Sequence, residues 1–204
     1  MSKKVVTFLN MSKGYRNVSK KNEGIAERHI RDIIATKGRN PFSTSNYFDL
    51  LNDLSKDSSI DLVNYVFMMS EDWMHSFCGG RNIGSVDVSN NFKMHYSSSF
   101  AKLKKMLMQS NLVIIRGNYS EWNIALKNIK CNYIFLPCWA RISPENIKIN
   151  LDPEKSTIWV DDIDIAKRFL GSGYTTDIFK KPAMSYFYSD LKNNKKEIDL
   201  CLVC

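Results

Sequence analysis

The densest group of ionisable side chains directly follows an apolar run. Residues 60–75 read IDLVNYVFMMSEDWMH. A carboxylate or an imidazole at the end of such a run could take the proton from a reacting hydroxyl group, which makes Glu71, Asp72 and His75 candidate general bases. The same residues also fit the start of a helix, with Ser70 as the N-cap and acidic residues in the first turn. The residue types alone leave both interpretations open.

An arginine stands in the clearest strand–loop–helix pattern, residues 111–122, which read NLVIIRGNYSEW. The apolar part has no polar alternation, as is typical of a strand buried on both faces. Ligands of open α/β sheets bind beyond the carboxyl ends of strands, so Arg116, Gly117 and Tyr119 are candidate binding residues. Ser120 is the predicted N-cap of the next helix, whose N-terminus would favour an anion. The alternative is a surface arginine in a turn.

Other polar residues follow other predicted strands. They are Lys13 and Gly14 after residues 5–9, Trp139 and Arg141 after 130–136, and Asp161 and Asp162 after 157–160. The two aspartates could hold a metal or orient a sugar hydroxyl, although Asp162 also fits as a helix N-cap. We predict no cofactor, because the loop at 10–23 has neither a GxGxxG pattern nor a Walker lysine. We predict no metal site at His75 and Cys78, which lack a second pair of ligands nearby.

Alternating strands and helices would position these candidates. Strands are expected at 5–9, 60–68, 112–115, 130–136 and 157–160, and helices at 24–37, 45–54, 99–109, from 120 onward and at 163–170. For the run at 60–69 a helix is the competing prediction. Residues 77–89 contain three glycines and are expected to be irregular. About five strand–helix repeats predict an α/β fold with a doubly wound, mostly parallel, Rossmann-like sheet. The strands' carboxyl ends would then form a single crevice.

The chain is basic but its charges are dispersed in sequence. Its 204 residues carry 29 Lys and Arg against 21 Asp and Glu, a net charge of +8, with no long block of like charge. The predicted helix at 99–109 has Phe100, Leu103, Met106 and Leu107 on one face, and Lys102, Lys104 and Lys105 on the other. The lysines form a solvated face or, alternatively, a patch that faces an anion or a membrane. Nucleic acid is not the expected partner, because the charges are scattered.

Cysteines and apolar runs indicate the compartment. An odd number of cysteines, five, without regular spacing argues against a disulfide framework. The run at 5–9 is too short for a signal peptide, and the run at 60–69 contains Asp61 and Asn64, so it should not span a bilayer. We therefore expect a cytoplasmic protein that could contact the membrane surface weakly from inside.

The end of the chain resembles a known family. Residues 177–204 read DIFKKPAMSYFYSDLKNNKKEIDLCLVC. This segment is similar to the interdomain crossing of two-domain glycosyltransferases of the GT-B architecture, through Lys181-Pro182-Ala183, Phe187-Tyr188 and the run at 196–203. The Arg116-Gly117 turn and the strand at 157–162 are similar in placement to the first domain of that family.

The resemblance implies a domain division and an activity. Residues 1–176 would be the Rossmann-like acceptor-side domain, 177–197 the linker, and 198–204 the first strand of a second domain. Cys204 stands where the family has the glycine of the donor loop, and the donor domain would be missing. The chain alone should then transfer sugar inefficiently, because catalysis needs donor and acceptor held together.

In this interpretation the substrates are a nucleotide sugar and a hydroxyl acceptor. One of Glu71, Asp72 and His75 would deprotonate the acceptor, while Arg116 and Arg141 would pair with its phosphate or carboxylate groups. Two alternatives stay open. The first is a basic α/β module that binds nucleic acid or anionic lipid. The second is another Rossmann-like enzyme that acts on a nucleotide or a sugar phosphate.

Overall fold

The computed structural model describes residues 4–11, 47–68, 83–137 and 142–178. The predicted helix at 24–37 and the predicted strand at 198–203 lie outside these ranges and stay predictions.

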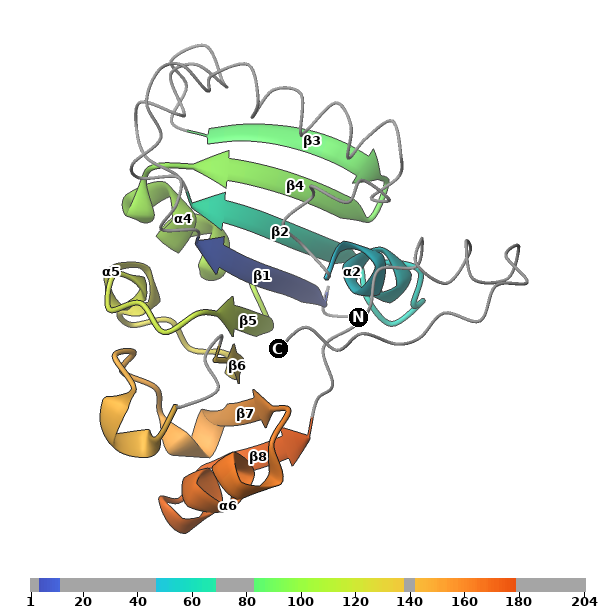
Figure 1. The fold of residues 1–204 in the computed structure, drawn as a ribbon. Helices are drawn as coiled ribbons and strands as arrows, with labels where there is room; N and C mark the ends of the chain where they lie inside the picture. The colour runs from blue at the N-terminus through green and yellow to red at the C-terminus, as the bar shows by residue number, and fades with distance from the viewer. Residues whose placement is uncertain (1–3, 12–46, 69–82, 138–141, 179–204) are drawn as a thin grey trace, which may run out of the picture.

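The described residues contain one eight-stranded sheet. Its strands are β1 (Val5–Met11), β2 (Leu62–Met68), β3 (Ile83–Ser89), β4 (Phe92–Ser97), β5 (Leu112–Arg116), β6 (Asn132–Leu136), β7 (Ser156–Val160) and β8 (Thr175–Ile178). Their order is β3-β4-β2-β1-β5-β6-β7-β8. Neighbouring strands are parallel except β3 and β4, and in Figure 1 the arrow of β3 points opposite to those of β4, β2 and β1. The predicted α/β fold with a mostly parallel sheet is confirmed.

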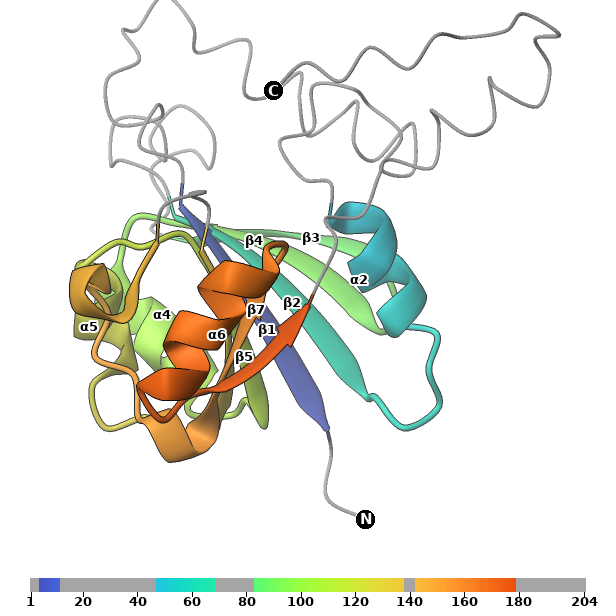
Figure 2. The ribbon, with the colours of Figure 1, turned by 60° about the horizontal axis from the view of Figure 1, so that its bottom comes forward.

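Helices pack on both faces of the sheet. They are α2 (Phe48–Leu54), α4 (Phe100–Leu107), α5 (Trp122–Leu126) and α6 (Ile163–Gly171). α4, α5 and α6 share a first hydrophobic core with one face, and α2 shares a second core with the other. Figure 2 shows α2 across the sheet from the other three helices. None of the helices in the described ranges has the length and apolar character that crossing a membrane requires.

β5 shows how one strand serves both cores. Successive side chains of a strand point to opposite faces. Val113 and Ile115 lie in the first core, Ile114 lies in the second, and all three are at most 4% exposed. The prediction of a central strand buried on both faces is confirmed.

α4 begins at Phe100, one residue after the predicted start, and ends at Leu107, two residues before the predicted end. The Ser99 side chain accepts a hydrogen bond from the backbone N–H of Lys102 at 3.4 Å and so caps the helix. Leu103 and Leu107 are fully buried in the first core, and Phe100 and Met106 pack partly buried against it. The predicted amphipathic helix is therefore present.

The order of strands reverses at β1. β2 and β4 continue to one side of β1, whereas β5, β6, β7 and β8 continue to the other. The chain connections that follow β1 and β5 therefore lead to opposite sides, and ligands of open α/β sheets bind beside such a position at the carboxyl ends of the strands.

A hairpin occupies residues that the sequence analysis expected to be irregular. Residues 83–89 form β3, and Asn90 and Asn91 connect it to β4 in an antiparallel pair, with a register shift between Asp87 and Ser89. The prediction of an irregular segment is wrong for these residues. β4 alternates as a strand should, with Phe92 and Met94 in the second core.

β8 was likewise not predicted. Residues 175–178 pair in parallel with β7 at the edge of the sheet. Its four residues include only one apolar side chain, Ile178, which is 43% exposed, so the sequence has little hydrophobic signal. The first two residues of the expected linker, 177 and 178, therefore belong to a strand.

Buried polar side chains form a row of hydrogen bonds across neighbouring strands, next to the first core. Thr7 and Ser110 share a hydroxyl hydrogen bond of 2.7 Å, and Asn64 Nδ2 donates to Thr7 Oγ1 at 3.4 Å. His95 Nε2 lies 2.9 Å from Asn64 Oδ1. Because an amide oxygen accepts, Nε2 carries the proton. Burial, and to a smaller extent the charge of Lys93, lowers the pKa of His95 to about 4, so this side chain is neutral at pH 7.

Candidate functional site

Arg116 lies at the carboxyl edge of the sheet, where the strand order reverses. It is the last residue of β5 and is half-buried. Its guanidinium carbon lies 5.3 Å from the ring centroid of Tyr47, a buried residue that directly precedes α2. This cation–π contact orients the arginine on the face of the second core. A guanidinium in such a place can bind a phosphate or a carboxylate through two parallel hydrogen bonds.

Gly117 links the ends of β5 and β6 at this edge. Its backbone N–H donates to the carbonyl of Leu136 at 3.0 Å, which extends the pairing of β5 and β6. Its φ is +86°, and a Cβ atom there would lie 2.5 Å from Cε2 of Tyr119. A residue with a side chain would therefore meet both an unfavourable backbone conformation and the tyrosine ring.

We expect Gly117→Ala to lower the free energy of unfolding by about 2 kcal/mol, because a positive φ alone costs an alanine about 1 kcal/mol and Tyr119 must also move. Gly173→Ala is the matched control. Its φ is +85°, but nothing lies within 4 Å of the added Cβ. Urea unfolding should show a smaller loss for the control, and the two losses should agree in a Tyr119→Ala background. Equal losses in the Tyr119 protein would contradict the predicted clash.

Two asparagines clamp the loop that precedes β7 against the start of α5. Asn118 Nδ2 donates to the carbonyl of Asn146 at 2.8 Å, and Asn118 Oδ1 accepts from the N–H of Lys148 at 2.7 Å. Asn123 repeats this arrangement, with Nδ2 donating to the carbonyl of Lys148 at 2.9 Å and Oδ1 accepting from the N–H of Asn150 at 2.8 Å. These partners lie 25–30 residues away in the chain. No local sequence signal could have identified them.

The predicted anion site at the start of α5 is not formed as expected. The helix has only five residues and its N-cap is Glu121, with no capping hydrogen bond from its side chain. Ser120, the predicted N-cap, instead bonds to the Glu121 carboxylate at 3.3 Å. The N-cap prediction is wrong, because Glu121 is the N-cap and the helix begins one residue later than predicted, at Trp122. Trp122, Ala125 and Leu126 are nevertheless buried, as the helical spacing predicts.

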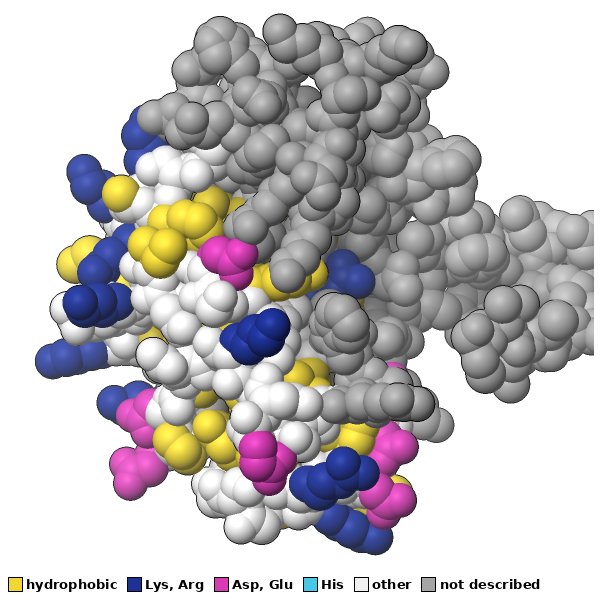
Figure 3. All heavy atoms as spheres, turned by 60° about the vertical axis from the view of Figure 1, so that its left-hand side comes forward, with side chains coloured by type: hydrophobic (Ala, Val, Ile, Leu, Met, Phe, Trp, Pro, Cys, Tyr) yellow, Lys and Arg dark blue, Asp and Glu magenta, His cyan; other side chains and the backbone are white. Residues whose placement is uncertain are grey.

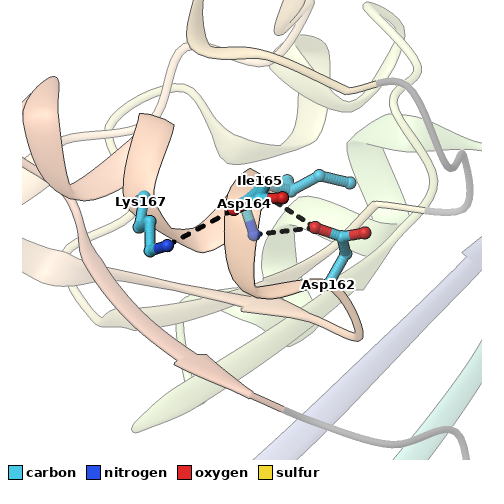
Figure 4. A network of polar contacts seen from close by, with 4 residues as sticks. All are labelled: Asp162, Asp164, Ile165 and Lys167. Atoms are coloured by element: carbon cyan, nitrogen blue, oxygen red, sulfur yellow. Dashed lines mark hydrogen bonds and ion pairs between the residues drawn. The ribbon is translucent and has the colours of Figure 1, made fainter.

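Asp162 caps α6. Its Oδ1 accepts from the backbone N–H of Asp164 at 2.8 Å and from that of Ile165 at 3.1 Å, as Figure 4 shows. Of the two interpretations for Asp161 and Asp162, the capping role of Asp162 is therefore present in the structure. Within the described ranges, no three His, Cys, Asp or Glu side chains come together as a metal-binding group.

We expect Asp162→Ala to destabilise the protein by about 1 kcal/mol, because two backbone N–H groups lose their acceptor. Asp162→Asn and Asp162→Ser should restore most of that stability, since both side chains can still accept the bond. Thermal unfolding of the three variants tests this. A loss of the same size in all three would indicate a role for the negative charge other than capping.

The remaining candidate residues lie outside the described ranges. They are Lys13, Gly14, Glu71, Asp72, His75, Trp139 and Arg141. In the chain they follow β1, β2 and β6, whose carboxyl ends share an edge with that of β5 because all four strands are parallel. Their predicted roles at this edge stay predictions.

Comparison of the chain with models of protein families, with curated proteins and with solved structures finds no match.

Proposed function

We propose that this chain is the acceptor-side domain of a GT-B-type glycosyltransferase, with a doubly wound sheet. It would hold a hydroxyl acceptor at the carboxyl edge for transfer of a sugar from a nucleotide sugar. The observation that carries the proposal is the reversal of strand order between β1 and β5 with Arg116 beside it. Small ligands of open α/β sheets bind at this kind of position.

The proposed roles follow from the chemistry of each side chain. Arg116 would pair with a phosphate or carboxylate of the acceptor. Glu71, Asp72 or His75, each in the segment that follows β2, would take the proton from the acceptor hydroxyl. The oxygen would form a bond to the anomeric carbon, while the bond from that carbon to the nucleoside diphosphate breaks and the diphosphate leaves.

The sequence at the end of the chain supports a second domain as the site of the donor. The linker would follow β8, over residues 179–197, and 198–204 would be the first strand of that domain, as the resemblance to GT-B enzymes implies. The absence of a GxGxxG or Walker pattern at 10–23 also favours a donor nucleotide bound elsewhere.

Calorimetry with small probes tests the proposal. We expect the chain to bind glucose 6-phosphate more tightly than UDP, and Arg116→Gln to weaken the binding of glucose 6-phosphate by about tenfold, since hydrogen bonds to charged groups are lost. Arg168→Gln, an exposed arginine on α6, is the control and should change nothing. Tighter binding of UDP than of the sugar phosphate would contradict the acceptor-side assignment and favour a nucleotide enzyme.

A further inference from the structure

Among the described residues, basic side chains are frequent around α4 and α5. Residues 97–137 hold six Lys and Arg against one Asp or Glu, whereas residues 142–178 hold four against seven. Figure 3 views the side that carries α4 and α5, where Lys and Arg side chains are frequent, and Asp and Glu side chains lie mostly below, toward α6. The surface therefore has a positive region next to a more acidic one.

We define the α4–α5 face as Lys102, Lys105, Met108, Ile124 and Lys127. All five are exposed, and α4 and α5 pack against each other on the same face of the sheet. Met108 is 71% and Ile124 60% exposed, the two largest values among the exposed large hydrophobic side chains in the described residues. The face thus combines lysines with protruding apolar side chains.

The lysines of this face differ in ion pairing from four other lysines of the described residues. Lys56, Lys93, Lys155 and Lys167 each lie 2.6–3.4 Å from an aspartate oxygen. Among the described residues, no carboxylate lies within ion-pairing distance of Lys102, Lys105 or Lys127. Their positive charge is therefore not neutralised locally and is directed at whatever approaches α4 and α5.

We propose that the α4–α5 face docks the protein on a bilayer that contains anionic lipid. Lysines beside a bilayer are attracted by its negative surface potential, and apolar side chains enter the headgroup boundary. Single-stranded nucleic acid is instead bound through aromatic stacking and arginine, and the face has neither. The inference goes beyond the proposed function, because docking requires no sugar chemistry.

Co-sedimentation with vesicles tests the docking. We expect the protein to bind vesicles of phosphatidylglycerol and phosphatidylcholine, to bind pure phosphatidylcholine weakly, and to be released as salt is raised. The triple variant Lys102→Gln, Lys105→Gln, Lys127→Gln should bind about a hundredfold more weakly, at about fivefold for each lysine. The matched control is Lys56→Gln, Lys155→Gln, Lys167→Gln, which removes the same charge elsewhere and should change binding by only a few-fold.

A second pair of variants tests the apolar contribution. Met108→Ser with Ile124→Ser should weaken vesicle binding by about tenfold. Ile163→Ser with Leu170→Ser, at exposed positions of α6, is the control and should leave vesicle binding unchanged. Equal losses in both lysine triples would overturn the proposal. The proposal would also be overturned if the protein bound duplex DNA more tightly than the anionic vesicles, and if Met108→Ser with Ile124→Ser left the DNA binding unchanged. That result would identify nucleic acid as the partner.

Discussion

Trp122→Ala is expected to lower the free energy of unfolding by about 3–5 kcal/mol, the usual cost of removing a buried tryptophan. Trp122 is fully buried in the first core, and its ring meets that of Phe100 edge-on with centroids 6.3 Å apart. The side chain therefore joins α5 to α4, and its loss leaves a cavity beneath both. Urea unfolding measures the change.

Two further variants separate packing from polarity at this position. Ile124→Ala, in the same helix but 60% exposed, should change stability by less than about 0.5 kcal/mol. Trp122→Phe should cost much less than the alanine, because Trp122 Nε1 is buried with no hydrogen-bond partner among the described residues, so phenylalanine loses no such bond. A loss at Trp122→Phe as large as that at Trp122→Ala would contradict this account.

The stability of the protein should fall by about 3 kcal/mol as the pH is lowered from 6.5 to 4, through His95 alone. Burial lowers the pKa of His95 from 6.5 to about 4 in the folded protein. Between these pH values the unfolded chain binds the proton and the folded protein does not. The contribution is therefore fully present above pH 6.5 and is lost as the pH falls through this window.

His95→Gln provides the comparison, since glutamine has no charge to gain. The unfolding free energies of the two proteins should run parallel above pH 6.5 and converge below it. Lys93 and Asp87, which lie near His95 and form an ion pair of 3.2 Å, are present in both proteins. A constant difference from pH 7 to pH 4 would show that His95 does not titrate as expected.

Long apolar runs made much of the sheet predictable. β1, β2, β5, β6 and β7 each coincide with a run in which apolar residues dominate, and burial on two faces leaves little choice of conformation for such a run. The hairpin of β3 and β4 was harder to predict from the sequence, because Gly84, Asp87 and Lys93 interrupt the runs of apolar residues. The alternation from Phe92 onward and the Asn90-Asn91 turn could have indicated it.

The features that the sequence did not predict depend on contacts between residues that are distant in the chain. Ser120 has the right type for an N-cap, but α5 begins one residue later, in a part of the chain that Asn118 and Asn123 bond to residues 146–150. Tyr47 could not be assigned to Arg116 from the sequence, because 69 positions separate them and they meet only through the packing of the second core. The sequence predicted the lysines of α4, but it did not show that Lys127 and Ile124 lie beside them, because the packing of α4 against α5 depends on the fold.

We expect the carboxyl edge of the sheet to bind a small anionic hydroxyl compound. Nuclear magnetic resonance of backbone amides during a titration with glucose 6-phosphate tests it most directly. The account predicts shifts at Gly117, Asn118 and Asp161, beyond the carboxyl ends of β5 and β7, and none at Asn111 or Cys131, which precede β5 and β6 at the opposite edge. Shifts confined to that opposite edge, or no shifts at any concentration, would contradict it.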